Sequence, residues 1–147
     1  MIATEREQRE AVLAEARSWL RTPYHHHANV KGAGVDCAYF VMECYAAAGL
    51  ANRIEPGHYP PDWFMHRGEE RYLSQVLAQA REFSGPPQPA DLVMFKIGRL
   101  WAHGAVVVEW PVVIHACSRA RCVTLAEADR GELGERQRRY FTLWGNA

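Results

Sequence analysis

The chain changes character at one short run of glycine and prolines, Gly85–Pro89. Before this run, apolar residues recur at the spacing of amphipathic helices, and after it short β-rich segments alternate with turns. Helices in one part of a chain and strands in the other are typical of an α+β architecture. A chain of 147 residues has the size of a single domain. We therefore expect one domain over residues 1–147, with N-terminal helices packed on a C-terminal antiparallel β-sheet.

Three helices are predicted in the first part of the chain. The first begins at Thr4, which forms the pattern of a capping box with Glu7. It ends just before Pro23, because a proline disfavours helical geometry in the residue that precedes it. A second helix over Cys37–Ala48 is apolar almost all round, so we expect it to be buried. The periodic apolar residues of Tyr72–Ala80 predict a third helix.

The second part of the chain contains five β-rich runs, which we predict to form a meandering antiparallel sheet. Residues 24–36 and 51–68 carry the glycines and prolines that are typical of loops, and they are predicted to be irregular. The predicted strands are Asp91–Phe95, His103–Glu109, Val112–His115, Arg121–Leu125 and Arg138–Trp144.

The charge balance and the apolar stretches limit the partners of this chain. Seventeen basic and seventeen acidic side chains give a formal net charge of zero. Nucleic acids and anionic membranes both attract an excess of basic residues, so neither is an expected partner. The apolar stretches are too short to cross a bilayer, and the first residues contain no apolar core of a signal peptide. We expect a protein made in the cytoplasm without a signal peptide and without membrane insertion.

The four cysteines offer little for disulfides or metal binding. Cys37 and Cys44 would lie about 10.5 Å apart along one helix, which is too far for a disulfide. Cys117 and Cys122 flank a predicted turn and could approach each other, although reduced thiols are the default in a cytosolic chain. No pair of cysteines has the spacing of a zinc knuckle, so no structural metal site is expected.

Cys37 stands at a position that suits a nucleophile. It opens the buried helix directly after Asp36. A helix N-terminus favours negative charge and so lowers the pKa of a thiol placed there. The competing interpretation is that Cys37 is a small buried side chain, as most cysteines are. Asp36 likewise has a simpler role as the N-cap of the helix.

Two histidines could complete a catalytic group with this cysteine. His103 begins one predicted strand and His115 ends the next, and antiparallel neighbours place such positions side by side. A cysteine nucleophile needs an imidazole within reach and a third group that orients the imidazole. We predict Cys37 as the nucleophile, His103 as its base and His115 as the orienting residue. The Cys37 sulfur should lie within about 4 Å of a His103 ring nitrogen.

With these residues the sequence resembles the NlpC-type, papain-like cysteine peptidases of bacterial cell-wall turnover. The order and spacing of the matching segments agree with that family over roughly residues 10–125. A Thr-Pro-Tyr segment, a Gly-rich loop and a Pro-Pro-Asp-Trp segment resemble the phage-tail subgroup of these peptidases. The segments are Thr22–Tyr24, Gly34–Cys37, Pro60–Trp63, Ala90–Phe95, His103–Val106 and Ile114–Ala116.

This resemblance implies a papain-like fold and the hydrolysis of peptide bonds in peptidoglycan stem peptides, next to D-glutamate and a diamino acid. It implies that the Tyr24 hydroxyl faces the reaction centre, that Asp36 helps to bind a substrate amine, and that no cofactor is needed. The implied partners are the stem peptide and phage-tail proteins, which would deliver the enzyme in a phage-tail-like particle. The chain departs from the family pattern at Ala38 and Tyr39, which replace Ser and Gly, and at His25–His27, which replaces an aromatic segment.

Three other interpretations stay open. A non-catalytic phage-tail assembly or structural protein could keep the fold, although the intact Cys37, His103 and His115 argue against such a relic. An amidase, thioesterase or acyltransferase could use the same triad, because function lies in the pocket rather than in the fold. The His25–His27 run could bind a metal. Consecutive side chains of an extended loop point in different directions, however, so a solvated loop is the better interpretation.

Overall fold

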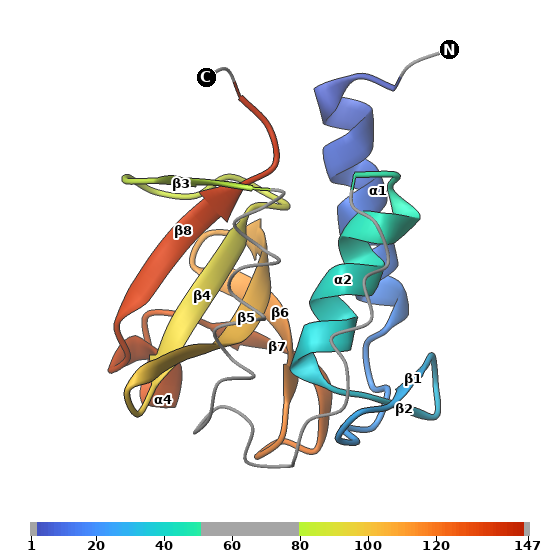
Figure 1. Ribbon diagram of the computed structural model, residues 1–147, viewed down its shortest axis with the longest axis vertical. Helices are drawn as coiled ribbons and strands as arrows, with labels where there is room; N and C mark the ends of the chain where they lie inside the picture. Colours follow the sequence, from blue (N-terminus) through green and yellow to red (C-terminus); the bar gives the residue numbers. More distant parts are fainter. Residues whose placement is uncertain (1–2, 51–79, 146–147) are drawn as a thin grey trace.

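A computed structural model describes residues 3–50 and 80–145. In this part of the chain two long helices lie side by side along one face of a six-stranded antiparallel sheet (Figure 1). A short helix packs against the opposite face of the sheet. The α+β fold class predicted from the sequence is confirmed.

Helix α1 (Glu5–Ser18) begins at the predicted capping box. The Thr4 hydroxyl accepts a hydrogen bond from the Glu7 amide at 3.1 Å, and the Glu7 carboxylate accepts one from the Thr4 amide at 2.9 Å. Two amides that the first turn of a helix leaves unpaired are thereby satisfied. The helix buries Val12 and Ala16 on the side that faces the rest of the domain.

Replacing Thr4 tests the contribution of this cap. Thr4→Ala removes the acceptor of the Glu7 amide, so we expect the free energy of unfolding to fall by about 1 kcal/mol. Urea denaturation followed by circular dichroism measures this change. Arg6→Ala is the matched control, because Arg6 lies in the same turn in an exposed ion pair with Glu10 and should change the stability by less than about 0.5 kcal/mol. Equal stability of the two variants would contradict the prediction.

Helix α2 (Cys37–Ala47) begins directly after Asp36, as predicted. The Asp36 carboxylate accepts a hydrogen bond from the Tyr39 amide at 3.0 Å and so caps the helix. The helix contacts both α1 and the sheet, which confirms the burial predicted from its apolar character. Its buried residues are Cys37, Ala38, Tyr39, Phe40, Val41, Cys44 and Tyr45.

The main sheet has the strand order β3-β8-β4-β5-β6-β7, and every neighbouring pair is antiparallel. The five predicted strands are all present, with ends displaced by three residues or fewer, and β3 is additional. The strands are β3 (Arg81–Phe83), β4 (Leu92–Ile97), β5 (Leu100–Glu109), β6 (Val112–Cys117), β7 (Cys122–Glu127) and β8 (Arg138–Thr142).

The sheet is not the simple meander that the sequence predicted. Strands β4 to β7 follow one another, but β8 returns to pair with β4 instead of adding beside β7. The outer edge of β7 is already paired, because Val123 exchanges two backbone hydrogen bonds with Arg21 and Thr22. An edge that is already paired offers no template for another strand. The chain therefore crosses back through the short helix α4 (Gly131–Gly134) before it forms β8.

A two-stranded sheet lies in the predicted loop between α1 and α2. Strands β1 (Asn29–Val30) and β2 (Gly34–Val35) pair in antiparallel fashion. A side-chain carbon at Gly34 would lie 3.1 Å from His25, so this position favours glycine. Strands of two residues are too short to give a periodic pattern, which explains why the sequence predicted only a loop here.

Apolar side chains pack on both faces of the main sheet. The cluster on the helix side joins α1 and α2 to strand residues such as Met94 and Ile114. The cluster on the opposite face includes Phe95 and Val107 and is covered by Leu133 of α4. Successive residues of a strand point to opposite faces, so each central strand contributes to both clusters.

Some sequence predictions lie outside the described residues. They are the helix over Tyr72–Ala80, of which only the last residue is described, the irregular segment 51–68, and the Pro60–Trp63 motif within it. Within the described ranges, no helix combines the length and the apolar character that a membrane span requires.

The four cysteines are free thiols. Cys37 and Cys44 lie on the same helix, in the arrangement that was predicted to prevent a disulfide. Cys117 and Cys122 are direct register partners on β6 and β7, so the turn does bring them together, and they are unbonded.

Candidate active site

Cys37 lies where α2 meets strand β5. It is the first residue of the helix, and only 5% of its surface is exposed. Its thiol donates a hydrogen bond to the Ala102 carbonyl, with sulfur and oxygen 3.7 Å apart. The Gly104 amide lies near enough to the sulfur to lower the pKa of the thiol. The sulfur therefore lies against the backbone of β5 next to His103.

His103 and His115 are in contact on neighbouring strands. Both rings line the α4 side of the sheet, the face opposite to α1 and α2. His103 Nε2 and His115 Nδ1 are 2.8 Å apart and form a hydrogen bond. The two rings meet edge to face with their centroids 5.0 Å apart. Both side chains are buried, so the pair is rigidly held.

The hydrogen bond donated by the Cys37 thiol runs to the backbone rather than to His103. Across residues 3–50 and 80–145, no hydrogen bond joins the Cys37 sulfur to a ring nitrogen of His103. Because His103 uses Nε2 to contact His115, Nδ1 is the nitrogen that remains to act on the thiol, and the ring lies on the face of the sheet opposite to α2. The structure thus shows a histidine pair, and a cysteine against the strand that carries His103. It does not show a hydrogen bond that joins the cysteine to this histidine pair.

Burial raises the pKa of the Cys37 thiol, and the neighbouring Asp36 carboxylate raises it further. The backbone amides of Cys37, Ala38 and Gly104 lower this pKa, which is the effect that the helix N-terminus predicted. They do not offset the loss of solvation. The prediction of a low thiol pKa is therefore wrong for the resting protein, and Cys37 holds its proton at neutral pH.

Burial also makes both histidines neutral. The pKa of His103 falls to about 3, first through burial and then through the proximity of His115 and of the Arg136 charge. The pKa of His115 falls to about 4 through burial, although the Glu132 carboxylate acts in the opposite direction. At neutral pH one ring must donate and the other accept in the hydrogen bond between them.

Tyr24 lies beside the cysteine. Its amide donates to the Arg121 carbonyl at 2.8 Å, which holds the residue along the outer edge of β7. Its side chain lies near both Cys37 and Asp36. Burial raises the pKa of the Tyr24 phenol, and the adjacent Cys37 and Asp36 raise it further. The phenol therefore stays protonated and is able to donate a hydrogen bond.

Asp36 is buried, and both of its oxygens accept backbone hydrogen bonds. The Tyr39 amide donates to Oδ1 at 3.0 Å, and the His27 amide donates to Oδ2 at 2.7 Å. These contacts fix the preceding loop against the first turn of α2. They establish the capping role of Asp36, whereas the binding of a substrate amine by Asp36 stays a prediction of the sequence.

The histidine run His25–His27 belongs to the loop that leads to Cys37. The His27 ring meets the Tyr39 ring edge to face at 5.7 Å between centroids, and the His26 and His27 rings are tilted against each other at 6.1 Å. In the two ranges that the structure describes, no group of three His, Cys, Asp or Glu side chains is arranged to hold a metal ion.

A cavity of about 650 Å³ lies beside the histidine pair, between the sheet and α4. His103 and His115 form part of its wall, and its charged lining includes Glu132 and Arg136. The sequence did not predict these charged residues as part of the site. Helix α4 is a single turn without a side-chain cap, so the sequence contains no periodic or capping signal that could have located it.

No known protein family and no curated protein matches the sequence. Solved structures do match the fold. NlpC1 from Trichomonas vaginalis superposes with a TM-score of 0.65 at 16% identity, covering 96% of this chain and 45% of that protein. The peptidoglycan hydrolase RipB from Mycobacterium tuberculosis gives a TM-score of 0.64 at 18% identity, covering 96% of this chain and 67% of that protein.

A non-catalytic protein has the same fold. RipD from Mycobacterium tuberculosis, an NlpC/p60 domain protein adapted to peptidoglycan binding, gives a TM-score of 0.60 at 12% identity, covering 93% of this chain and 98% of that protein. These similarities show that the chain has the NlpC/P60 fold, as the sequence resemblance predicted. They show the fold alone, because one fold can host different functions. The chain spans less than half the length of the Trichomonas protein.

Proposed function

We propose that this protein is a cysteine endopeptidase that hydrolyses peptide bonds in peptidoglycan stem peptides. The proposal depends on one observation, the hydrogen-bonded pair of His103 and His115 next to a cysteine whose thiol donates to Ala102, the residue before His103 in β5. A nucleophile, a base and an orienting residue are the parts that acyl transfer requires. The shared fold with peptidoglycan hydrolases such as RipB supports the substrate class.

The reaction starts from a neutral thiol and a neutral imidazole. His103 Nε2–H donates to His115 Nδ1, which fixes the tautomer with a lone pair on His103 Nδ1. Nδ1 takes the thiol proton while the Cys37 sulfur attacks the scissile carbonyl carbon. His115 then stabilises the imidazolium that forms on His103, as the third member of a triad does.

The carbonyl oxygen becomes negative when the sulfur adds to the carbon. We assign the Cys37 backbone amide and the Tyr24 hydroxyl as the donors to this oxyanion, since both lie at the sulfur. One such donor typically contributes about 3 kcal/mol to the stability of the transition state. The imidazolium of His103 protonates the leaving amine, and water then hydrolyses the thioester with His103 again acting as the base.

The finer parts of the proposal rest on the sequence resemblance. It assigns the scissile bond to D-glutamate followed by a diamino acid, with Asp36 helping to bind a substrate amine. It also associates the protein with a phage tail or a prophage. On that assignment the protein is delivered to the cell wall in a phage-tail-like particle.

A non-catalytic peptidoglycan-binding protein is the second candidate. The raised pKa of Cys37 and its hydrogen bond to a carbonyl favour this candidate, because a protonated thiol is not an activated nucleophile. RipD combines the same fold with a binding function. The buried pair of His103 and His115 favours the enzyme, since strongly perturbed titratable groups beside a cavity are typical of catalytic sites.

Mass spectrometry of purified peptidoglycan fragments after incubation with the protein separates these candidates. Hydrolysis should give two fragments whose combined mass exceeds that of the substrate by one water, and Cys37→Ala should give none. An amidase or acyltransferase that uses the same residues would cleave a different bond or add an amine in place of water. Intact fragments that bind equally to the wild type and to Cys37→Ala would identify a binding protein and end the peptidase proposal.

A further inference from the structure

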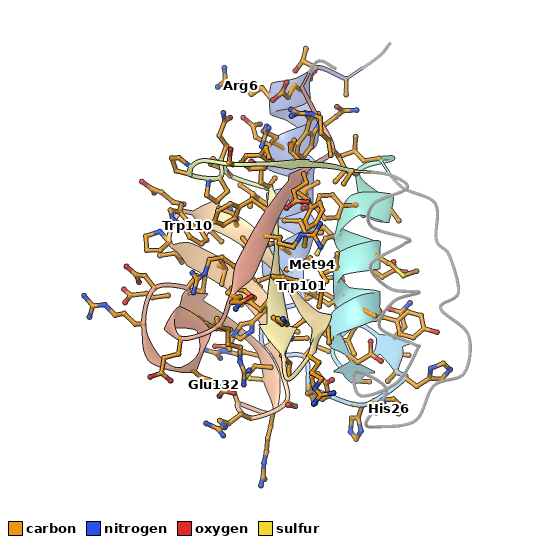
Figure 2. The ribbon with its side chains drawn as sticks, turned by 60° about the vertical axis from the view of Figure 1, so that its left-hand side comes forward. Arg6, His26, Met94, Trp101, Trp110 and Glu132 are labelled. Carbon is orange, nitrogen blue, oxygen red and sulfur yellow. The ribbon has the colours of Figure 1, made fainter. Side chains whose placement is uncertain are left out.

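The cavity beside the histidine pair lies on the face of the sheet that points away from α1 and α2. Residues of β5, β6, β7 and α4 line it, and its volume of about 650 Å³ falls in the range of small-ligand sites. Figure 2 shows Glu132 at this end of the molecule and Arg6 at the opposite end. Of the described residues, His103 and His115 belong to the cavity wall, whereas Cys37 does not.

The lining of the cavity has an excess of positive charge. Three arginines and two glutamates line it. Glu127 pairs with Arg130 at 3.0 Å. Glu132 is shared, because Arg136 approaches one of its oxygens at 2.7 Å and Arg119 approaches the other at 3.0 Å. Two guanidinium groups on one carboxylate leave one positive charge that an anionic ligand can balance.

Arg136 places this charge close to the reaction centre. Its guanidinium lies near enough to His103 to lower the pKa of that ring. Its Nη1 donates to the Lys96 carbonyl at 3.4 Å, and 27% of its side chain is exposed, so it is both anchored and accessible. A guanidinium group matches the geometry of a carboxylate and binds it through two parallel hydrogen bonds.

The two halves of a substrate meet different sides of this site. Tyr24 and Asp36 lie with Cys37, which forms the bond to the acyl half. His103 protonates the leaving amine in the proposed reaction, and its ring borders the cavity. The half of the substrate that carries this amine is therefore the half that the cavity can receive. This step rests on the proposed function.

We propose that the cavity between the sheet and α4 binds the leaving peptide through its free terminal carboxylate, which Arg136 and Arg119 hold beside Glu132. The site then selects stem peptides that end in a free carboxylate. A cross-linked stem peptide, whose terminal carboxyl group is part of an amide, lacks the charge that the two arginines bind.

Binding of dipeptides to Cys37→Ala protein tests this proposal without hydrolysis. The probes are L-lysyl-D-alanine and meso-diaminopimelyl-D-alanine, each as the free acid and as the C-terminal amide, titrated into ¹⁵N-labelled protein and followed by NMR. In at least one pair, the acid should bind about tenfold more tightly than the amide, because the amide loses a charge-assisted pair of hydrogen bonds.

Variants that each remove one arginine charge test whether these arginines cause the preference for the free acid. Arg136→Gln and Arg119→Gln should each reduce the preference for the acid to about threefold or less, because each removes one of the two guanidinium groups. Arg6→Gln, at the opposite end of the molecule, should leave the preference unchanged. The Arg119 side chain is 81% exposed, so its substitution leaves the fold intact and keeps the test valid if Arg136→Gln does not fold.

Several outcomes would overturn the proposal: equal binding of acid and amide, no binding of any probe, or an unchanged preference in the folded Arg119 and Arg136 variants. Hydrolysis of stem peptides by the wild type, measured beside the binding of the dipeptides, shows whether the carboxylate site or the proposed function has failed. Hydrolysis of stem peptides without a preference for the acid would defeat the inference alone. Acid-selective binding by a protein that hydrolyses no stem peptide would defeat the proposed function and keep the carboxylate site.

Discussion

His103→Ala is expected to slow single-turnover cleavage of a stem peptide nearly as far as Cys37→Ala, by about 10⁶-fold. Both residues take part in the proton and acyl transfer, and members of a catalytic unit contribute non-additively, so the loss of either one removes most of the benefit of both. Cys44→Ala is the matched control, because Cys44 is a fully buried thiol on the same helix. It should keep a rate close to that of the wild type.

The two histidines should differ in what can replace them. In the proposed reaction His115 Nδ1 is the acceptor in the 2.8 Å hydrogen bond with His103, so His115→Asn and His115→Gln can still accept and should retain substantial activity. His115→Ala leaves the His103 ring unanchored and should fall between those variants and His103→Ala. Thermal denaturation must first show that each variant folds, since both side chains are buried in the sheet.

Two results would contradict this assignment. If His115→Ala were as inactive as Cys37→Ala while His103→Ala kept a near-normal rate, then the base and the orienting residue would be reversed. If all of these variants cleaved the stem peptide at the rate of the wild type, then the chemistry would lie outside the three residues.

Local signals in the sequence were sufficient for much of the fold. The capping box of Thr4 and Glu7, the apolar helix that opens at Cys37, and the central strands each depend on residues close together in the chain. The contact between His103 and His115 also followed from local information, because the register of one tight hairpin places the two positions together. Such features are decided by neighbours along the sequence, which is why periodicity and turn residues reveal them.

Features that depend on distant segments were missed. The return of β8 to β4 requires knowledge that Arg21 and Thr22 already occupy the edge of β7. The cavity depends on α4, a single turn whose place is set by that return. Glu132 and Arg136 gain their importance only because this turn lies against the histidine pair, and nothing in their local sequence marks them.

The error in the thiol pKa has the same origin. The helix N-terminus is a local feature, and its amides do lower the pKa of Cys37 as predicted. The larger contribution is desolvation, which depends on how completely β5 and the neighbouring loop cover the sulfur. Burial of this kind is a property of the assembled fold and cannot be inferred from the residues on either side of Cys37.

The alkylation rate of Cys37 should therefore rise steeply with pH. Only the thiolate reacts with iodoacetamide, and the thiolate fraction increases about tenfold for each pH unit below the thiol pKa. Because the pKa of Cys37 is raised, the rate should climb by about 10³-fold from pH 6 to pH 9 without reaching a plateau. His103, with a pKa of about 3, stays neutral over this range and adds no inflection. Mass spectrometry of digested protein gives the rate for each cysteine.

Two references make this measurement decisive. Urea-unfolded protein exposes Cys37 to water, so its rate should level off near the ordinary thiol pKa of about 8.5. Asp36→Asn removes a charge that raises the pKa but keeps an acceptor for the Tyr39 amide, so its profile should move to lower pH. A plateau in the native protein from pH 6 upward would mean that Cys37 and His103 already share their proton as a thiolate–imidazolium pair. In that case the resting site would be ionised, and the hydrogen bond from the thiol to the Ala102 carbonyl could not persist in solution.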